Sequence, residues 1–273
     1  MVVEKVAFCP TAESLLASTG RDGMVRLWDI RTPSGVVAAG SKGIPLGSCR
    51  VGQEGHFLTW HPNGREMLVG RKDDVIHTVD VRRMTGMTPA ETTFEMEAVE
   101  RSPVKDRGYF YAMSFSNTGR EVFATTHDGA VKILDYPSMS LLHTLSAHSS
   151  TTYTAQQSPT GGTLAIGSAD SLISIWDTRS WVCTHTLTSQ TTSVKDLSYS
   201  FDGVYLVAGS GSGSDAKEGS SGIEVYHVDT GEVVHTIETS NPITWAAWHP
   251  SRYMVAYAGD PGGLKIVGGG GLG

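Results

Sequence analysis

The sequence predicts an all-β fold, a β-propeller built from repeated units of antiparallel strands. In four of the units, two runs of alternating apolar residues flank a small-residue turn that carries an aspartate. A second aspartate follows seven residues later, at the end of the second run. This spacing recurs in the pairs Asp22 and Asp29, Asp73 and Asp80, Asp128 and Asp135, and Asp170 and Asp177. The 32 glycines among 273 residues suit a chain with many tight turns between short strands.

Six units follow one another along the chain. The expected first strands begin near residues 3, 56, 110, 152, 193 and 243. Equivalent strand ends at Phe115, Gln157 and Tyr199 are 42 residues apart, which fits a four-stranded blade of about 40–45 residues. Half-polar runs predict outer, fourth strands at 92–96, 141–145, 183–187 and 233–237. We therefore expect one propeller domain over 1–268 and a glycine-rich tail at 269–273.

Composition and charge limit the class of protein. A net charge of -7 argues against a broad, non-specific nucleic-acid binder, because such proteins are normally basic. The three cysteines have neither metal-ligand nor redox spacing, so they are expected to be reduced thiols of an intracellular protein. The chain contains no apolar run near the roughly 18 residues of a membrane span, and its first residues enter a strand pattern without a signal peptide.

A recurring set of polar residues is expected to form a structural network within the blades. In unit four, His148 precedes Asp170 by 22 residues and could bond it, with Ser168 and Trp176 completing a buried chain. The alternative is a serine nucleophile triad, but the order recurs with the fold period and lacks a Gly-x-Ser-x-Gly elbow. The corresponding residues in the other units are Asp22, Trp28, Asp73 and Asp128.

The pattern resembles the WD-repeat β-propeller family, with signature ends at residues 26–29 (Arg-Leu-Trp-Asp) and 174–177 (Ser-Ile-Trp-Asp). Residues 60–76, 131–148, 167–177 and 245–250 are more specifically similar to the family of THO complex subunit 3, and the Tyr136-Pro137 pair is the most telling part. The resemblance implies a non-catalytic subunit of the nuclear THO/TREX assembly, which couples transcription and mRNA processing to mRNA export. It also implies that a large helical scaffold subunit holds the protein. RNA contact is expected to be possible but indirect, and no cofactor, metal or membrane is expected.

Two other functions remain open. One is a propeller receptor for histone tails or for substrates of a ubiquitin ligase, which would need a peptide pocket at the axial mouth. The other is a propeller hydrolase with an axial metal, but the expected inner strands carry mainly Val, Ala, Leu and Ile rather than metal ligands.

The sequence departs from the family in two ways. Family members have seven blades, so we expect the missing unit to precede Val6. In unit one, Gly20 occupies the position of the expected Ser or Thr two residues before Asp22, which would weaken the network there.

Two insertions are candidate partner-binding loops on one face. Residues 97–108 carry both charge signs and a proline, whereas 209–222 are rich in Gly and Ser, so tolerated loop growth is an equal explanation for the second. The charged candidates are Glu100, Arg101, Lys105, Arg107, Asp215, Lys217 and Glu218. Five basic residues cluster in unit two, and we expect them to form a solvated blade surface rather than an RNA contact. Its members are Arg65, Arg71, Lys72, Arg82 and Arg83.

Overall fold

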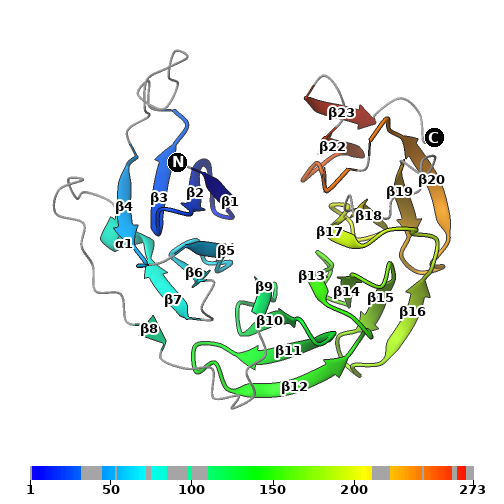
Figure 1. Cartoon of the computed structure of the whole chain (residues 1–273), viewed down its shortest axis with the longest axis horizontal. Coiled ribbons are helices and arrows are strands. Elements are labelled where there is room, and N and C mark those ends of the chain that lie inside the picture. Colours follow the sequence, from blue (N-terminus) through cyan, green and yellow to red (C-terminus); the bar gives the residue numbers. More distant parts are fainter. Residues whose placement is uncertain are drawn as a thin grey trace. The chain divides into compact units, whose positions relative to one another are not determined.

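The computed structural model is almost entirely β-structure, which confirms the predicted fold class (Figure 1). The structure describes residues 2–31, 45–52, 54–71, 75–84, 98–99, 110–210, 222–241, 243–259 and 263–268. Within these ranges, five four-stranded sheets and one three-stranded sheet are present, each formed by strands that are consecutive in the chain. The fold divides into two compact units, Met1–Val122 with Leu134–Leu142, and Phe123–Ile133 with His143–Gly273. The single domain over 1–268 stays a prediction.

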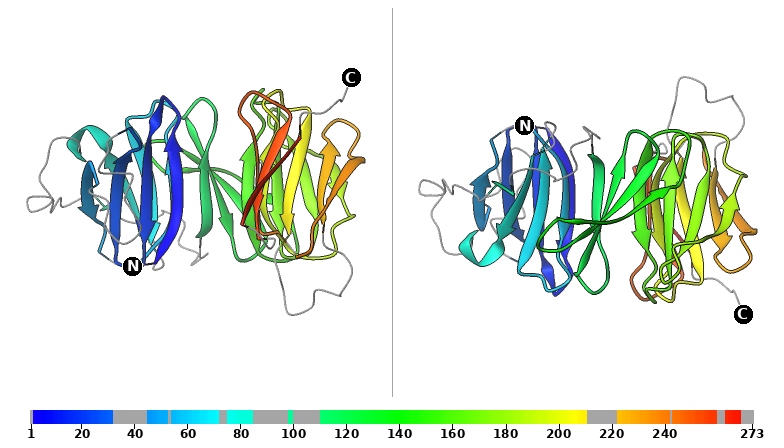
Figure 2. Two further views of the ribbon diagram at one scale, coloured as in Figure 1. Left: turned by 90° about the horizontal axis from the view of Figure 1, so that it is seen from above. Right: turned by 90° about the horizontal axis from the view of Figure 1, so that it is seen from below.

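The first compact unit begins with two complete sheets. Their elements are β1 (Val3–Cys9), β2 (Ala12–Gly20), β3 (Met24–Asp29), β4 (Gly47–Arg50), β5 (Gly55–Trp60), β6 (Glu66–Arg71), β7 (Ile76–Asp80), the short helix α1 (Val81–Met84) and β8 (Ala98–Val99). The strands of the first sheet, coloured from dark blue to a lighter blue, lie side by side in both views of Figure 2. The expected outer strand at 92–96 lies outside the described residues, and β8 is the strand that pairs with β7.

The third sheet contains residues of both compact units, and the second compact unit continues with three further sheets. The elements of the third sheet are β9 (Phe110–Phe115), β10 (Glu121–Thr126), β11 (Ala130–Asp135) and β12 (Leu141–Ser146). The remaining strands are β13 (Thr152–Gln157), β14 (Thr163–Ser168), β15 (Ile173–Asp177), β16 (Cys183–Leu187), β17 (Val194–Tyr199), β18 (Tyr205–Ser210), β19 (Gly222–His227), β20 (Val233–Glu238), β21 (Trp245–Trp248), β22 (Met254–Ala258) and β23 (Leu264–Gly268).

Burial follows the position of a strand within its sheet. Five of the six residues of β14 and of β18 are buried, because these second strands have a neighbour on each edge and side chains packed on both faces. The outer strand β20 buries only Ile237. Its exposed, half-polar character is what its sequence predicted for an edge strand. Ile173, Ile175 and Leu206 belong to one of the resulting buried clusters.

The outer strand β4 was not predicted from the sequence. The segment 47–50 (Gly-Ser-Cys-Arg) shows no apolar alternation, so it carries no strand signal of its own. It pairs with β3, and a Cβ atom at Gly47 would collide with the Met84 carbonyl oxygen. Close approach to the chain at α1 therefore requires glycine at this position.

Candidate functional site

The polar chain of unit four runs from a turn carboxylate to a tryptophan. His148 Nδ1 lies 3.1 Å from Asp170 Oδ2, and His148 Nε2 lies 2.9 Å from Ser174 Oγ. Trp176 Nε1 donates to the same Ser174 oxygen at 2.9 Å. With the His148 proton on Nδ1, the donors of this hydrogen-bonded series all point toward the Asp170 carboxylate, so each polar atom in the series has a partner.

Burial decides what this arrangement can do chemically. The order Ser174, His148, Asp170 has the hydrogen-bond geometry of a nucleophile triad. Ser174 is only 2% exposed, however, and its oxygen already accepts the Trp176 N–H. A substrate carbonyl has no approach to this hydroxyl, so the geometry supports a structural network that ties the loop before β13 to β15.

Ser168 holds a different place in the network from the one predicted. Its hydroxyl donates to the carbonyls of Ser150 at 3.2 Å and Thr151 at 3.1 Å, and it accepts the Asp170 N–H at 3.3 Å. It braces the turn rather than bonding His148 or Trp176. The link is Ser174, which the sequence analysis missed. The available signal was the period-two alternation of β15, which places residue 174 on the same side as residue 176.

The carboxylates of the tight turns are held in their charged form. Burial by itself would raise the pKa of Asp170, but attraction to His148 and hydrogen bonds from the Leu172 amide and Ser168 bring it below its ordinary value. Asp22 and Asp128 also have lowered pKa values, because side-chain hydrogen bonds from Arg26 and Thr126, respectively, favour their charged forms. These turns therefore depend on ionised aspartates.

In unit one, the equivalent residues form two separate pairs instead of one continuous network. Trp28 Nε1 donates to Ser18 Oγ at 2.8 Å, whereas Asp22 pairs with Arg26 through a 2.6 Å contact. The sequence predicts a weaker network here, because Gly20 replaces the expected Ser or Thr. The structure adds a second reason, since Arg26 occupies the strand position that Ser174 holds in unit four.

Unit three keeps the turn and loses the tryptophan. Asp128 accepts from the Thr126 hydroxyl and from the Ala130 amide at 3.2 Å, while Leu134 occupies the tryptophan position. Asp73, the predicted residue of unit two, lies outside the described residues.

Unit five has an equivalent network with different chemistry, which the sequence analysis did not find. The Tyr226 hydroxyl donates to Glu224 on the same strand. Glu224 Oε2 also accepts from Ser189 Oγ at 2.6 Å and from Gln190 Nε2 at 2.9 Å. Burial and the Glu224 carboxylate raise the pKa of Tyr226, so the phenol stays protonated. Tyr226 and Glu224 replace the tryptophan and serine of unit four at the same strand positions.

The Tyr136-Pro137 pair that is distinctive in the sequence has a packing role in the first compact unit. The Tyr136 hydroxyl donates to Glu66 Oε2 at 2.7 Å, and its ring lies 5.0 Å from Phe115 and 5.4 Å from His61. Tyr136 therefore connects the segment after β11 to the beginning of β6. Its pKa is raised by burial and by Glu66.

The predicted loop surface falls outside the part of the chain that the structure describes. All seven charged candidates, at positions 100–107 and 215–218, lie in segments that are not described. In the basic cluster, Lys72 also lies outside, Arg82 pairs with Asp80 at 2.7 Å and Arg71 donates to the Val51 carbonyl at 3.3 Å. These two arginines are thus engaged by the protein itself.

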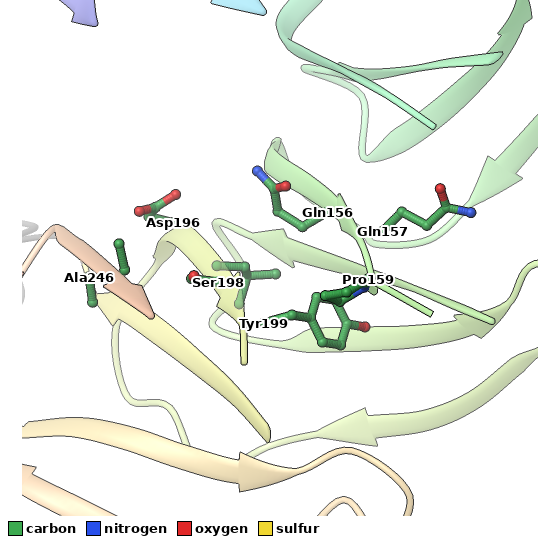
Figure 3. A pocket seen from close by; sticks show the side chains of 9 residues that line it. Gln156, Gln157, Pro159, Asp196, Ser198, Tyr199 and Ala246 are labelled. Atoms are coloured by element: carbon green, nitrogen blue, oxygen red, sulfur yellow. The ribbon is translucent and has the colours of Figure 1, made fainter. Parts of the chain in front are cut away.

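A cavity of about 360 Å³ opens in the second unit at the first strands of three successive sheets (Figure 3). It is lined by Gln156, Gln157, Pro159, Asp196, Leu197, Ser198, Tyr199, Ala246 and Ala247. Its polar groups lie on β13 and β17, and Ala246 and Ala247 come from β21.

The described residues contain no group of three or more His, Cys, Asp or Glu side chains that could hold a metal ion. None of their helices has the length and apolar character needed to cross a membrane. The three cysteines are free, with Cys9 and Cys49 buried and Cys183 exposed. Burial raises the pKa of Cys49 to about 12, so this thiol is an unreactive core residue.

Repeated four-stranded sheets with an aspartate turn and a Trp-Asp strand end are the features of WD-repeat β-propellers, and WD repeats are found in this chain. The family described as WD domain, G-beta repeat matches residues 3–29, 139–177 and 181–215. The chain is 29% identical to THO complex subunit 3 of Arabidopsis thaliana over 258 residues, which cover 94% of this chain and 72% of that protein. It is 27% identical to WD repeat-containing protein AAC3 of Dictyostelium discoideum over 261 residues, which cover 94% of this chain and 48% of that protein.

Proposed function

We propose that this chain is a non-catalytic, protein-binding subunit of a THO-type complex that acts in nuclear mRNA export. The similarity to THO complex subunit 3 carries the proposal, because it extends over 94% of the chain rather than over isolated repeat signatures. The blade motifs alone would support only the general role of an interaction scaffold. We further propose that a large helical scaffold subunit is the direct partner and that RNA contact is indirect.

The outer strands of the second unit offer surface suited to such a partner. Val182, beside β16, is 57% exposed, and Val233 and Val234 at the start of β20 are 41% and 51% exposed. Apolar side chains on edge strands are unfavourable in water and are typical of sites covered in an assembly. They support docking of the apolar side of a helix against these strands.

The test is affinity purification of the tagged full-length chain from nuclear extract, with and without ribonuclease. We expect the other THO subunits, including the large scaffold, to co-purify in both conditions. Loss of these proteins after ribonuclease would refute direct protein contact, and their absence in both conditions would refute membership of the complex. Recovery of histones or of ubiquitin-ligase subunits in their place would favour the receptor alternative.

A paired variant separates the proposed surface from the fold. Val233→Thr with Val234→Thr keeps β-branched side chains on β20 but makes them polar, and should weaken recovery of the scaffold. Thr230→Val, at an exposed position in the neighbouring turn, makes the opposite change in polarity and should leave recovery unchanged.

A further inference from the structure

One face of the sheet β21–β23 is apolar and exposed. Directly paired residues of neighbouring strands point to the same side of a sheet. Leu264 and Ile266 of β23 are 69% and 61% exposed, and Trp245 of β21 is 50% exposed. The strand registers give two adjacent rows across this face, which we call the β23 face: Trp245, Ala258 and Leu264, then Ala247, Ala256 and Ile266.

A junction between two sheets of the second compact unit shows what covers such a face. Ile173 and Ile175 are the first and third residues of β15, as Leu264 and Ile266 are of β23. Both isoleucines are 0% exposed, and they share a buried cluster with Leu197 and Tyr199 of β17 in the next sheet. An apolar face of this kind is therefore covered by the first strand of another sheet.

The first sheet of the chain carries the counterpart of that covering surface. Phe8 pairs with Leu16 and Leu16 with Trp28, as Tyr199 pairs with Leu206 and Leu206 with Tyr226. Val6 and Phe8 are 50% and 57% exposed, whereas the equivalent Leu197 and Tyr199 are buried. We call this surface the β1 face, and its apolar members are Val6, Phe8, Leu16 and Trp28.

The polar residues of the β1 face already have partners. Ser18 and Arg26 lie in the same row as Val6. Ser18 Oγ accepts the Trp28 Nε1–H at 2.8 Å, and Arg26 pairs with Asp22 at 2.6 Å. Covering the β1 face would therefore remove apolar surface from water without leaving these two polar side chains unpaired.

We propose that the β23 face of one chain packs on the β1 face of a second copy of the same chain. The occupant follows from the repeat, because the two faces are of the kinds that pack on each other between β15 and β17. Exposed apolar surface of this extent is typical of a protein interface. The contact is heterologous, so each pair of chains still presents one face of either kind and can bind further copies.

Sedimentation velocity of the 273-residue chain over a range of concentrations tests the proposal. We expect dimers and larger species whose share rises with concentration. Phe8→Lys and Ile266→Lys each place a charge in the middle of one face, and each should weaken self-association about thirtyfold or more. A wild-type chain that stays monomeric at every concentration would overturn the proposal.

Mixing the two variants makes the test specific to the pairing of unlike faces. The Phe8→Lys chain keeps its β23 face and the Ile266→Lys chain keeps its β1 face, so the mixture should form a dimer that cannot grow. A mixture that stays monomeric would contradict the proposal. Undiminished self-association of Phe8→Lys alone would also contradict it, since the β23 face would then bind something other than the β1 face.

A matched control and a second variant guard against effects on folding. Thr144→Lys adds the same charge at an exposed position of the outer strand β12 and should leave self-association unchanged. Circular dichroism and Tm verify that each variant is folded. If Ile266→Lys does not fold, Leu264→Lys replaces it on the same face.

The proposed contact does not rest on the THO-type function, and the two can fail separately. If the chain recovers THO subunits but stays monomeric, the proposed contact is wrong and the proposed function stands. If the chain self-associates through these faces but recovers no THO subunit, the proposed function is wrong and the contact stands.

Discussion

Two serine-to-alanine changes in unit four test the polar chain that the structure defines. Ser174→Ala removes the atom that joins His148 to Trp176, whereas Ser168→Ala removes a hydroxyl that braces the turn. Both serines are buried, at 2% and 0% exposure, and both changes delete the same single atom. The difference between the two variants therefore reports the hydrogen-bond partners rather than burial.

The partners set the expected magnitudes. Without Ser174, the Trp176 N–H and His148 Nε2 both lose their partner, and a partly buried unsatisfied group costs about 1–3 kcal/mol, so we expect a loss of about 3 kcal/mol in the free energy of unfolding. Ser168 makes longer bonds of 3.1–3.3 Å, and the Thr151 carbonyl keeps a second donor, the Ala169 amide. We expect Ser168→Ala to cost about 1 kcal/mol.

Thermal and urea unfolding, followed by tryptophan fluorescence, would measure both variants. For a chain of this size, about 3 kcal/mol corresponds to a decrease of about 6 °C in Tm, and about 1 kcal/mol to about 2 °C. A double-mutant cycle between His148→Ala and Ser174→Ala should show coupling, since the two residues share a bond. If Ser168→Ala were as destabilising as Ser174→Ala, the assignment of Ser174 as the link between His148 and Trp176 would be wrong.

Three further predictions concern other parts of the chain. Ser171 has a φ of +67°, so Ser171→Gly should raise Tm slightly. Gly129 has a φ of +89°, and a Cβ there would collide with the His148 carbonyl oxygen, so Gly129→Ala should lower Tm by several degrees. Thermal unfolding measures both variants, and Tm changes of the same sign would contradict the reasoning. Tyr136→Phe should cost about 1 kcal/mol through loss of the bond to Glu66, measured by urea unfolding, and an unchanged midpoint would contradict that role. Aspartates with a lowered pKa stabilise the fold at pH values above their ordinary pKa of 3.8, and this contribution is lost as the pH falls through the lowered pKa values. Tm should therefore fall steeply below about pH 4. A flat Tm profile down to about pH 3 would contradict this. The aspartates concerned are Asp22, Asp29, Asp80, Asp128, Asp170, Asp177 and Asp202.

The repeat and its strands could be predicted because their signals are local. Alternation and the spacing of the turn aspartates depend only on residues a few positions apart, so β14, β15 and the outer strand β20 were found from the sequence. The strand β4 was not, because its residues carry no alternation and its pairing depends on β3 and α1. Similarly, the Tyr136 side chain is recognisable as unusual in the sequence, but its partner Glu66 is 70 residues away.

The sequence by itself determined the fold class, the six repeated units and the aspartate turns, since each is written in short periodic patterns. Only the tertiary structure decided which serine completes the chain to Trp176, because Ser168 and Ser174 lie on adjacent strands, one before and one after Asp170. It also decided that Tyr226 and Glu224 replace this network in unit five, and that residues of β13, β17 and β21 line one cavity. Those relations depend on contacts between different strands and loops, which no local pattern encodes.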